Sequence, residues 1–177
     1  MDMDVDEFEL DAAPVTDPSR GQLWGRYRGT VASVDDDDRM GRITVRVPSV
    51  YGDNESPPAY PVAPFAGEGH GFLFLPEVGD GVWVEFEGGD QSHPLWTGAW
   101  WAKNEMPDEA DVESRVIVTS AGLKLVMDDD AKKLQLLNGA KGEITIADDG
   151  ITIRFGSTKV VIDDAGVSIN DTAFKVS

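Results

Sequence analysis

The sequence predicts an all-β fold, and three observations support this prediction. From residue 22 onward, short runs rich in β-branched and aromatic residues alternate with polar residues. Clusters of Gly, Pro, Asp and Asn separate these runs at short intervals, as turns do. No segment places apolar residues at the spacing of an amphipathic helix. Both halves of the chain should therefore consist of strands joined by turns.

A repeat in the last third of the chain is the most distinctive pattern. Residues 144–153 and 160–169 align without a gap, and each contains a β-branched run, an acidic turn, a Gly and a second β-branched run. A weaker copy begins at residues 125–130 and continues at 134–136. Repetition of one strand–turn–strand unit is typical of stacked architectures.

Composition narrows the classes of function. The chain has 177 residues and a net charge of −18, from 33 Asp and Glu against 15 Lys and Arg. This charge repels nucleic acid and anionic membrane surfaces, so neither is expected as a stable partner. The chain has no cysteine, which excludes disulfides and thiolate sites. It has no apolar run long enough to cross a membrane, and its first residues are too acidic for a signal peptide.

Residues 1–20 are expected to form an acidic arm. This arm is either flexible or ordered against a neighbouring subunit, for which Phe8 and Leu10 offer apolar side chains. A first domain follows over residues 21–102, with a long Pro-rich connection at 49–70. Its five expected strands are 23–34, 41–47, 72–75, 82–86 and 94–101. Five short strands with a long connection after the second predict a small barrel of the OB type.

Residues 103–114 are expected to be a linker, and residues 115–177 a second all-β region. Its expected strands are 115–119, 123–127, 132–137, 143–147, 151–155, 159–163, 167–169 and 173–176. One face of these strands is apolar, and nine residues on it are the candidates for a buried core: Ile144, Ile146, Ile151, Ile153, Phe155, Val160, Ile162, Val167 and Ile169.

A single thin apolar face needs a second layer to cover it. The linker argues against packing on the first domain, so identical copies are the expected partners. The acidic turns at 128–130, 148–149 and 163–164 would then lie in solvent at the corners of a prism. We therefore expect three chains to wind into a trimeric, intertwined β-helix or β-prism, a stiff spike about 35 Å long at the usual strand spacing.

The first domain also resembles a known family. An ordered series of residues carries this resemblance: Tyr27, Gly29, Val31, Gly41, Arg42, Val45, Val47, Pro48, Pro76, Val78, Gly79, Asp80, Val82, Val84, Phe86, Gly89, Asp90, Pro94, Gly98, Trp100 and Trp101. The series is similar to the OB-fold domain of the phage baseplate assembly protein V and type VI secretion Vgr spike family. In that family, a trimeric β-helical spike follows the OB domain.

The resemblance implies a structural role rather than an enzymatic one. The protein would be the central spike of a contractile injection machine, such as a phage tail, a tailocin or an extracellular injection particle. It would assemble in the cytoplasm as a homotrimer, lie below the tail hub at the baseplate or tail tip, and help to puncture the target envelope. It would touch the target membrane only transiently, during puncture.

The chain departs from some members of the family. The linker leaves no room for the lysozyme domain that some phage members carry, and the hub domain fused in type VI members is absent. A separate hub protein is therefore implied. No histidine follows His93, so the iron-binding apex of some short phage spikes is missing. A separate tip protein of the PAAR-repeat type is expected to cover the C-terminal end.

No catalytic, cofactor-binding or metal-binding residue is predicted. His70 and His93 are too few for a metal site. The loop at 35–41 resembles a calcium loop only in its charge, and a solvated turn is the default interpretation. Two rival functions stay open. One is a tail-associated glycan or peptidoglycan hydrolase using Glu85 and Glu87. The other is an OB-fold nucleic-acid binder using the aromatic residues of the first domain, which lack an accompanying basic groove and are better explained by core packing and subunit contacts.

Overall fold

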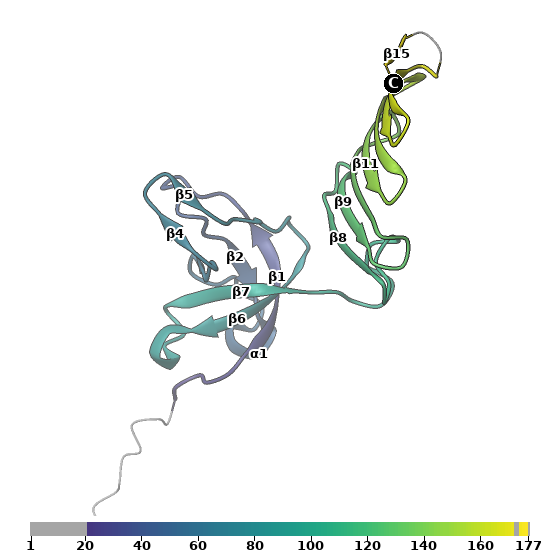
Figure 1. The fold of residues 1–177 in the computed structure, drawn as a ribbon. Coiled ribbons are helices and arrows are strands. Elements are labelled where there is room, and N and C mark those ends of the chain that lie inside the picture. Colours follow the sequence, from purple (N-terminus) through teal and green to yellow (C-terminus); the bar gives the residue numbers. More distant parts are fainter. Residues whose placement is uncertain (1–20, 172–173, 177) are drawn as a thin grey trace, which may run out of the picture. The chain divides into compact units, whose positions relative to one another are not determined.

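β-strands dominate the computed structural model, which describes residues 21–171 and 174–176 (Figure 1). The all-β prediction is therefore confirmed. The expected arm at residues 1–20 lies outside the described residues. The chain divides into two units, Met1–Ala102 and Lys103–Ser177, which are described separately below. Within the described residues, no helix has the length and apolar character needed to cross a membrane.

The N-terminal unit is built on a five-stranded sheet in the order β2-β1-β6-β7-β3. Its strands are β1 (Tyr27–Ser33), β2 (Thr44–Arg46), β3 (Tyr60–Pro61), β6 (Gly81–Phe86) and β7 (Pro94–Trp100). Isolated bridges pair Ile43 with Ala59 and Arg46 with Glu55, which ties β2 to the segment before β3. The sheet thus curls into an OB-like, partly closed barrel, as the strand pattern predicted.

The interior of this barrel is filled by alternate residues of its strands. Val82, Val84 and Phe86 of β6 point inward and are nearly inaccessible to solvent. Ile43, Val45 and Val47 are buried in the same core cluster. Removing these branched side chains from water is the main source of stability for the barrel.

The prediction of a strand at 72–75 is wrong. The position beside β7 is occupied instead by β3, which pairs with it in parallel through Tyr60 and Pro61. Residues 72–75 find no strand partner among the described residues, and their large apolar side chains remain exposed. A continuous apolar run has no alternation from which to read a buried face, so it does not specify strand pairing. Two short strands, β4 (Ala66–Gly67) and β5 (His70–Gly71), form a hairpin just before it.

The chain also contains short helical turns that the sequence pattern did not reveal. One α-helical turn, α1 (Pro48–Tyr51), begins at the proline that ends the β2 segment, and a 3-10 turn, η1 (Glu87–Gly89), joins β6 to β7. Proline suits the first position of a helix because its fixed φ matches and its missing N–H has no helical partner there. A four-residue helix is too short to show a helical period.

The C-terminal unit is one eight-stranded antiparallel meander in which each strand pairs with its neighbours in the sequence. Every strand bound lies within one residue of its predicted position. The strands are β8 (Ser114–Val118), β9 (Leu123–Asp128), β10 (Lys133–Asn138), β11 (Gly142–Ala147), β12 (Gly150–Phe155), β13 (Thr158–Asp163), β14 (Gly166–Ile169) and β15 (Phe174–Val176).

The glycine of the repeated acidic turn has a specific steric role. Gly150 has a φ of +138°, and a Cβ added there would lie 2.2 Å from the backbone carbonyl oxygen of Ile162 on the next strand. Only glycine permits that approach and that backbone conformation together. Gly156, in the turn between β12 and β13, has a φ of +60° but open space around it.

These two glycines give a matched test of the sheet register. Gly150→Ala should lower the free energy of unfolding by about 3 kcal/mol or more, because backbone strain and a clash with β13 combine. Gly156→Ala should cost only about 1 kcal/mol, the usual penalty for a left-handed alanine. Thermal or denaturant unfolding followed by circular dichroism measures both. Equal losses in the two variants would contradict this register.

Candidate functional site

The register of the C-terminal sheet places apolar side chains in two continuous columns on one face. Each member lies directly opposite the next one on the neighbouring strand. The first column is Ile117, Leu125, Leu136, Ile144, Ile153, Val160, Ile169 and Phe174. The second is Met127, Leu134, Ile146, Ile151, Ile162 and Val167. We call this surface the aliphatic face.

The aliphatic face has no covering layer in the single chain. Leu136 is 48% exposed, Ile153 45% and Phe155 67%, and other members of the face, such as Ile151 and Val160, are half-buried. A contiguous apolar surface of this extent is unusual for a soluble monomer and marks a site of association. The geometry therefore points to a protein-binding surface rather than to a catalytic pocket.

The structure brings the nine predicted core candidates onto this one face. Eight of them belong to the two columns, and Phe155 follows Ile153 on the same side of β12. The sequence reasoning missed the part of the face on β8, β9 and β10. Its residues are Ile117, Leu125, Met127, Leu134 and Leu136. Alternation in 123–127 and 134–136 is the signal that would have found most of them.

The opposite face of the sheet is mainly polar in its central strands. Thr145 donates a 2.6 Å hydrogen bond to Glu143, and Gln135 contacts both residues from the neighbouring strand. The hydrogen bond from Thr145, followed by those from Gln135 and the charges of nearby basic residues, lowers the pKa of Glu143 despite partial burial. This satisfied network suits a solvent-facing surface, so the two faces of the sheet differ in chemistry.

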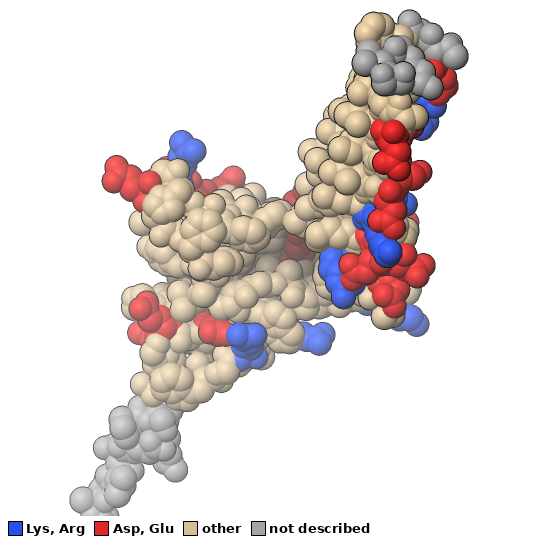
Figure 2. All heavy atoms as spheres, in the orientation of Figure 1, with Lys and Arg blue, Asp and Glu red and all other residues tan. Residues whose placement is uncertain are grey.

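Acidic turns lie along one side of the same sheet, where strand ends meet. The turns after β9, β11 and β13 are on the same side because successive strands of a meander run in opposite directions. They carry the acidic pairs and triplet of the repeat, at residues 128–130, 148–149 and 163–164. Figure 2 shows acidic side chains gathered along one side of this unit. The charge therefore lies beside the aliphatic face and not within it.

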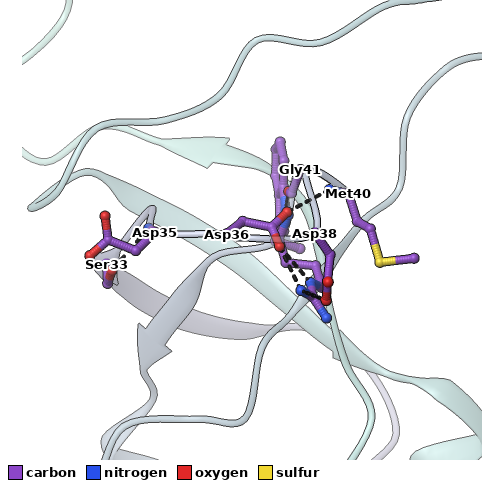
Figure 3. Close-up of polar contacts among 8 residues, drawn as sticks. Ser33, Asp35, Asp36, Asp38, Met40 and Gly41 are labelled. Carbon is purple, nitrogen blue, oxygen red and sulfur yellow. Dashed lines mark hydrogen bonds and ion pairs between the residues drawn. The ribbon is translucent and has the colours of Figure 1, made fainter. Parts of the chain in front are cut away.

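The acidic loop at 35–41 is a clamped turn (Figure 3). Asp36 accepts hydrogen bonds from the backbone of Met40 at 2.6 Å and of Arg42 at 3.1 Å, and from the Arg42 guanidinium at 2.6 and 2.9 Å. Arg42 also reaches Asp38 at 2.5 Å. Both oxygens of Asp36 are thus occupied by donors, which agrees with a structural turn rather than a calcium loop.

This clamp shifts the pKa of both partners. Burial acts to raise the pKa of Asp36, but the hydrogen bonds from Arg42 and from the backbone outweigh it, and the net shift is downward. The hydrogen bonds from Asp36 and Asp38 raise the pKa of Arg42. The charged forms are therefore the stable ones at neutral pH.

The two residues named for a hydrolase lie in different elements. Glu85 lies on β6 and forms a 2.6 Å ion pair with Arg26, whereas Glu87 begins the 3-10 turn η1 beyond the end of that strand. His93 pairs with Asp90 at 3.3 Å, and His70 contacts the backbone of Glu68. The described residues contain no group of three His, Asp or Glu placed to hold a metal.

Comparison with protein families agrees with both units. Residues 27–101 match the model for the type VI secretion system/phage-baseplate injector OB domain. Residues 114–175 match the model for the phage baseplate V C-terminal trimerisation domain. A search of curated proteins finds no match.

The two models match in the order of the family and together span more than three quarters of the chain. The chain therefore belongs to the phage baseplate V and type VI secretion injector family. Both matched models describe structural parts of an injection baseplate. The resemblance found in residues 24–101 is thus confirmed.

The Asp36 clamp predicts a specific dependence on pH. Because the pKa of Asp36 is depressed in the folded state, its stabilising effect is present above the ordinary pKa of Asp, about 3.9, and is lost as pH falls through the folded value. Asp36→Asn should lower the thermal unfolding midpoint at pH near 7. The difference from the unmodified protein should shrink as acid protonates Asp36.

Asp37→Asn is the matched control, because Asp37 is an exposed neighbour in the same loop. It should leave the midpoint nearly unchanged at every pH. Unfolding curves recorded by tryptophan fluorescence over a pH series measure all three proteins. A gap between Asp36→Asn and the unmodified protein that stays constant into acid would contradict the role given to the clamp.

Proposed function

We propose that the protein is the central spike of a contractile injection machine and that it works as a homotrimer. The observation that carries this proposal is the aliphatic face, which runs across the described strands of the C-terminal sheet and remains exposed in one chain. The match of residues 114–175 to a trimerisation domain supports a three-chain partner for this face.

The sheet geometry supports a three-sided prism. Strands β9 to β14 are each hydrogen-bonded on both sides within one chain, so copies need to contribute only face packing. Three sheets that turn their aliphatic faces inward would bury all nine predicted core residues along a common axis. Their acidic turns would lie at the corners, where solvent screens the charges.

Such a prism suits a mechanical task. Eight strands at the usual spacing of about 4.8 Å make a rod roughly 34 Å long. Its backbone hydrogen bonds run between successive strands. Unfolding it under load would require many backbone hydrogen bonds and apolar contacts to break together.

The proposal includes partners that complete the machine. The barrel of the N-terminal unit would lie below a separate tail hub at the baseplate, after assembly in the cytoplasm. The last strand, β15, would offer an open edge to a separate PAAR-type tip, with membrane contact only during puncture. Co-purification with the hub and tip products of neighbouring genes tests this assignment. Failure of both to bind the purified assembly would count against it.

The rival functions have less support. The hydrolase would need two free carboxylates on one cleft, whereas Glu85 is paired with Arg26. Activity on peptidoglycan that disappears in Glu85→Gln would revive it. A nucleic-acid binder would have to overcome the net charge of −18.

Two adjacent residues on β12 allow a matched test of the trimer. Ile153 lies on the aliphatic face and Thr152 on the opposite face. Ile153→Glu should abolish the trimer, because three carboxylates would be buried together on the axis without partners. Thr152→Glu adds the same charge on the solvent side and should leave the trimer intact.

Chemical cross-linking and SDS gels run without heating measure both variants. The unmodified protein and Thr152→Glu should give a three-chain band, and Ile153→Glu should give single chains. A three-chain band that survives in Ile153→Glu, or is lost equally in both variants, would contradict the proposed packing.

A further inference from the structure

A second unusual surface lies on the outer side of the N-terminal sheet. Arg28 of β1 lies near two tryptophans, Trp83 on the neighbouring strand β6 and Trp100 on β7, the strand beyond it. Its guanidinium carbon is 5.4 Å from the ring centroid of Trp83 and 4.9 Å from that of Trp100. Arg28 and Trp83 are direct cross-strand partners. We call these three residues the Arg28 platform.

Neighbouring backbone groups hold the Trp100 ring of the platform in position. A Cβ added to Gly81 would lie 2.6 Å from the Trp100 ring, so the glycine makes room for the ring to lie over the strand. The Trp100 indole N–H donates a 3.1 Å hydrogen bond to the carbonyl oxygen of Val82, which holds the ring in place. A held Trp100 ring beside Trp83, with a cation near both, forms a preorganised surface rather than a chance contact.

The charge of Arg28 has no carboxylate partner among the described residues. On the same outer side of the sheet, Arg26 pairs with Glu85 and Arg46 pairs with Glu55. Arg28 is exposed, and its guanidinium lies over the two indole rings. A guanidinium held between aromatic rings retains donors for a carboxylate, and the rings offer apolar contact beside it.

We propose that the acidic N-terminal segment of this chain, centred on residues 6–11, binds the Arg28 platform. Residues 1–20 contain seven Asp and Glu and one Arg, which complement the free cation. Within them Phe8 stands between Glu7 and Glu9, so an aromatic ring and carboxylates alternate. In this arrangement, Phe8 could pack on an indole ring while a neighbouring carboxylate pairs with the Arg28 guanidinium.

Chain length permits this contact. The described chain begins at Gly21, and the backbone N–H of Leu23 bonds to the carbonyl of Gly89 at 2.8 Å, which anchors the segment at the barrel. An extended chain covers about 3.3 Å per residue, so the twelve residue steps from position 11 to Leu23 can span about 40 Å. Arg28 lies only five positions after Leu23, at most about 17 Å away along the chain, so the segment can reach it. The inference does not depend on the proposed trimer.

Glutamyl endopeptidase cleavage of the full-length protein after Glu7 and Glu9 tests the proposal. A synthetic peptide of residues 1–20 gives the unprotected rate under the same conditions. The unmodified protein should be cut about tenfold or more slowly than the peptide, because binding hides the site from the protease. Arg28→Gln should bring the rate close to that of the peptide, and Arg28→Lys should fall between them.

Arg39→Gln is the matched control, since Arg39 is an exposed arginine on the loop 35–41 of the same unit. It removes one charge far from the two indoles in sequence and should leave cleavage slow. The unfolding midpoints of all variants are measured alongside, to confirm that each is folded. Equal cleavage of the protein and the peptide, or equal effects of Arg28→Gln and Arg39→Gln, would overturn the proposal. Arg28-dependent binding of single-stranded oligothymidylate without protection of Glu7 would assign the platform to nucleic acid and would also overturn it.

Discussion

The C-terminal unit depends on one constraint, which is that its aliphatic face must be removed from water. The chain satisfies its own backbone hydrogen bonds within the meander, but it supplies nothing to cover that face. At roughly 25 cal/mol per Å² of apolar surface, a face of this size represents a large stabilisation that a single chain leaves unrealised. Copies of the same chain offer a surface of matching length and spacing, which is why self-association fits this unit.

The N-terminal unit, in contrast, covers its own apolar core. Its barrel buries its own branched side chains, and the clamp between Asp36 and Arg42 closes the β1–β2 loop with local hydrogen bonds. Its notable exposed surface is small and consists of a few particular side chains. The Arg28 platform presents a cation between two indole rings, on a chain that is otherwise strongly acidic. One unit thus offers a broad apolar face for assembly, and the other a small charged surface for a particular segment.

Local sequence patterns, such as apolar–polar alternation and turn residues, predict much of this structure. They fail where the structure depends on contacts between residues far apart in the sequence. Strands 142–169 were predictable because a two-residue period agrees with Gly-containing turns between the runs, and one face of each strand is apolar, which favours a single register. Gly150 illustrates this agreement, since its turn position and its close approach to Ile162 both require glycine.

The prediction of a strand at residues 72–75 failed because hydrophobicity alone does not select a pairing partner. In the structure, β3 pairs with β7 instead. The Arg28 platform was also beyond sequence reasoning. It depends on the register of β1 against β6 and on the placement of the Trp100 ring over Gly81. These contacts bring Arg28 to tryptophans 55 and 72 positions away in the sequence. The sequence shows the tryptophans and Arg28, but it does not show that they lie side by side.

The mass of the native protein in solution tests the central claim most directly. Sedimentation equilibrium over a range of concentrations needs no variant and no assumption about shape. If the aliphatic face is buried between three copies, the mass should equal three times that of the 19.2 kDa chain and should not fall on dilution into the micromolar range. A stable mass of one chain at those concentrations would contradict the account.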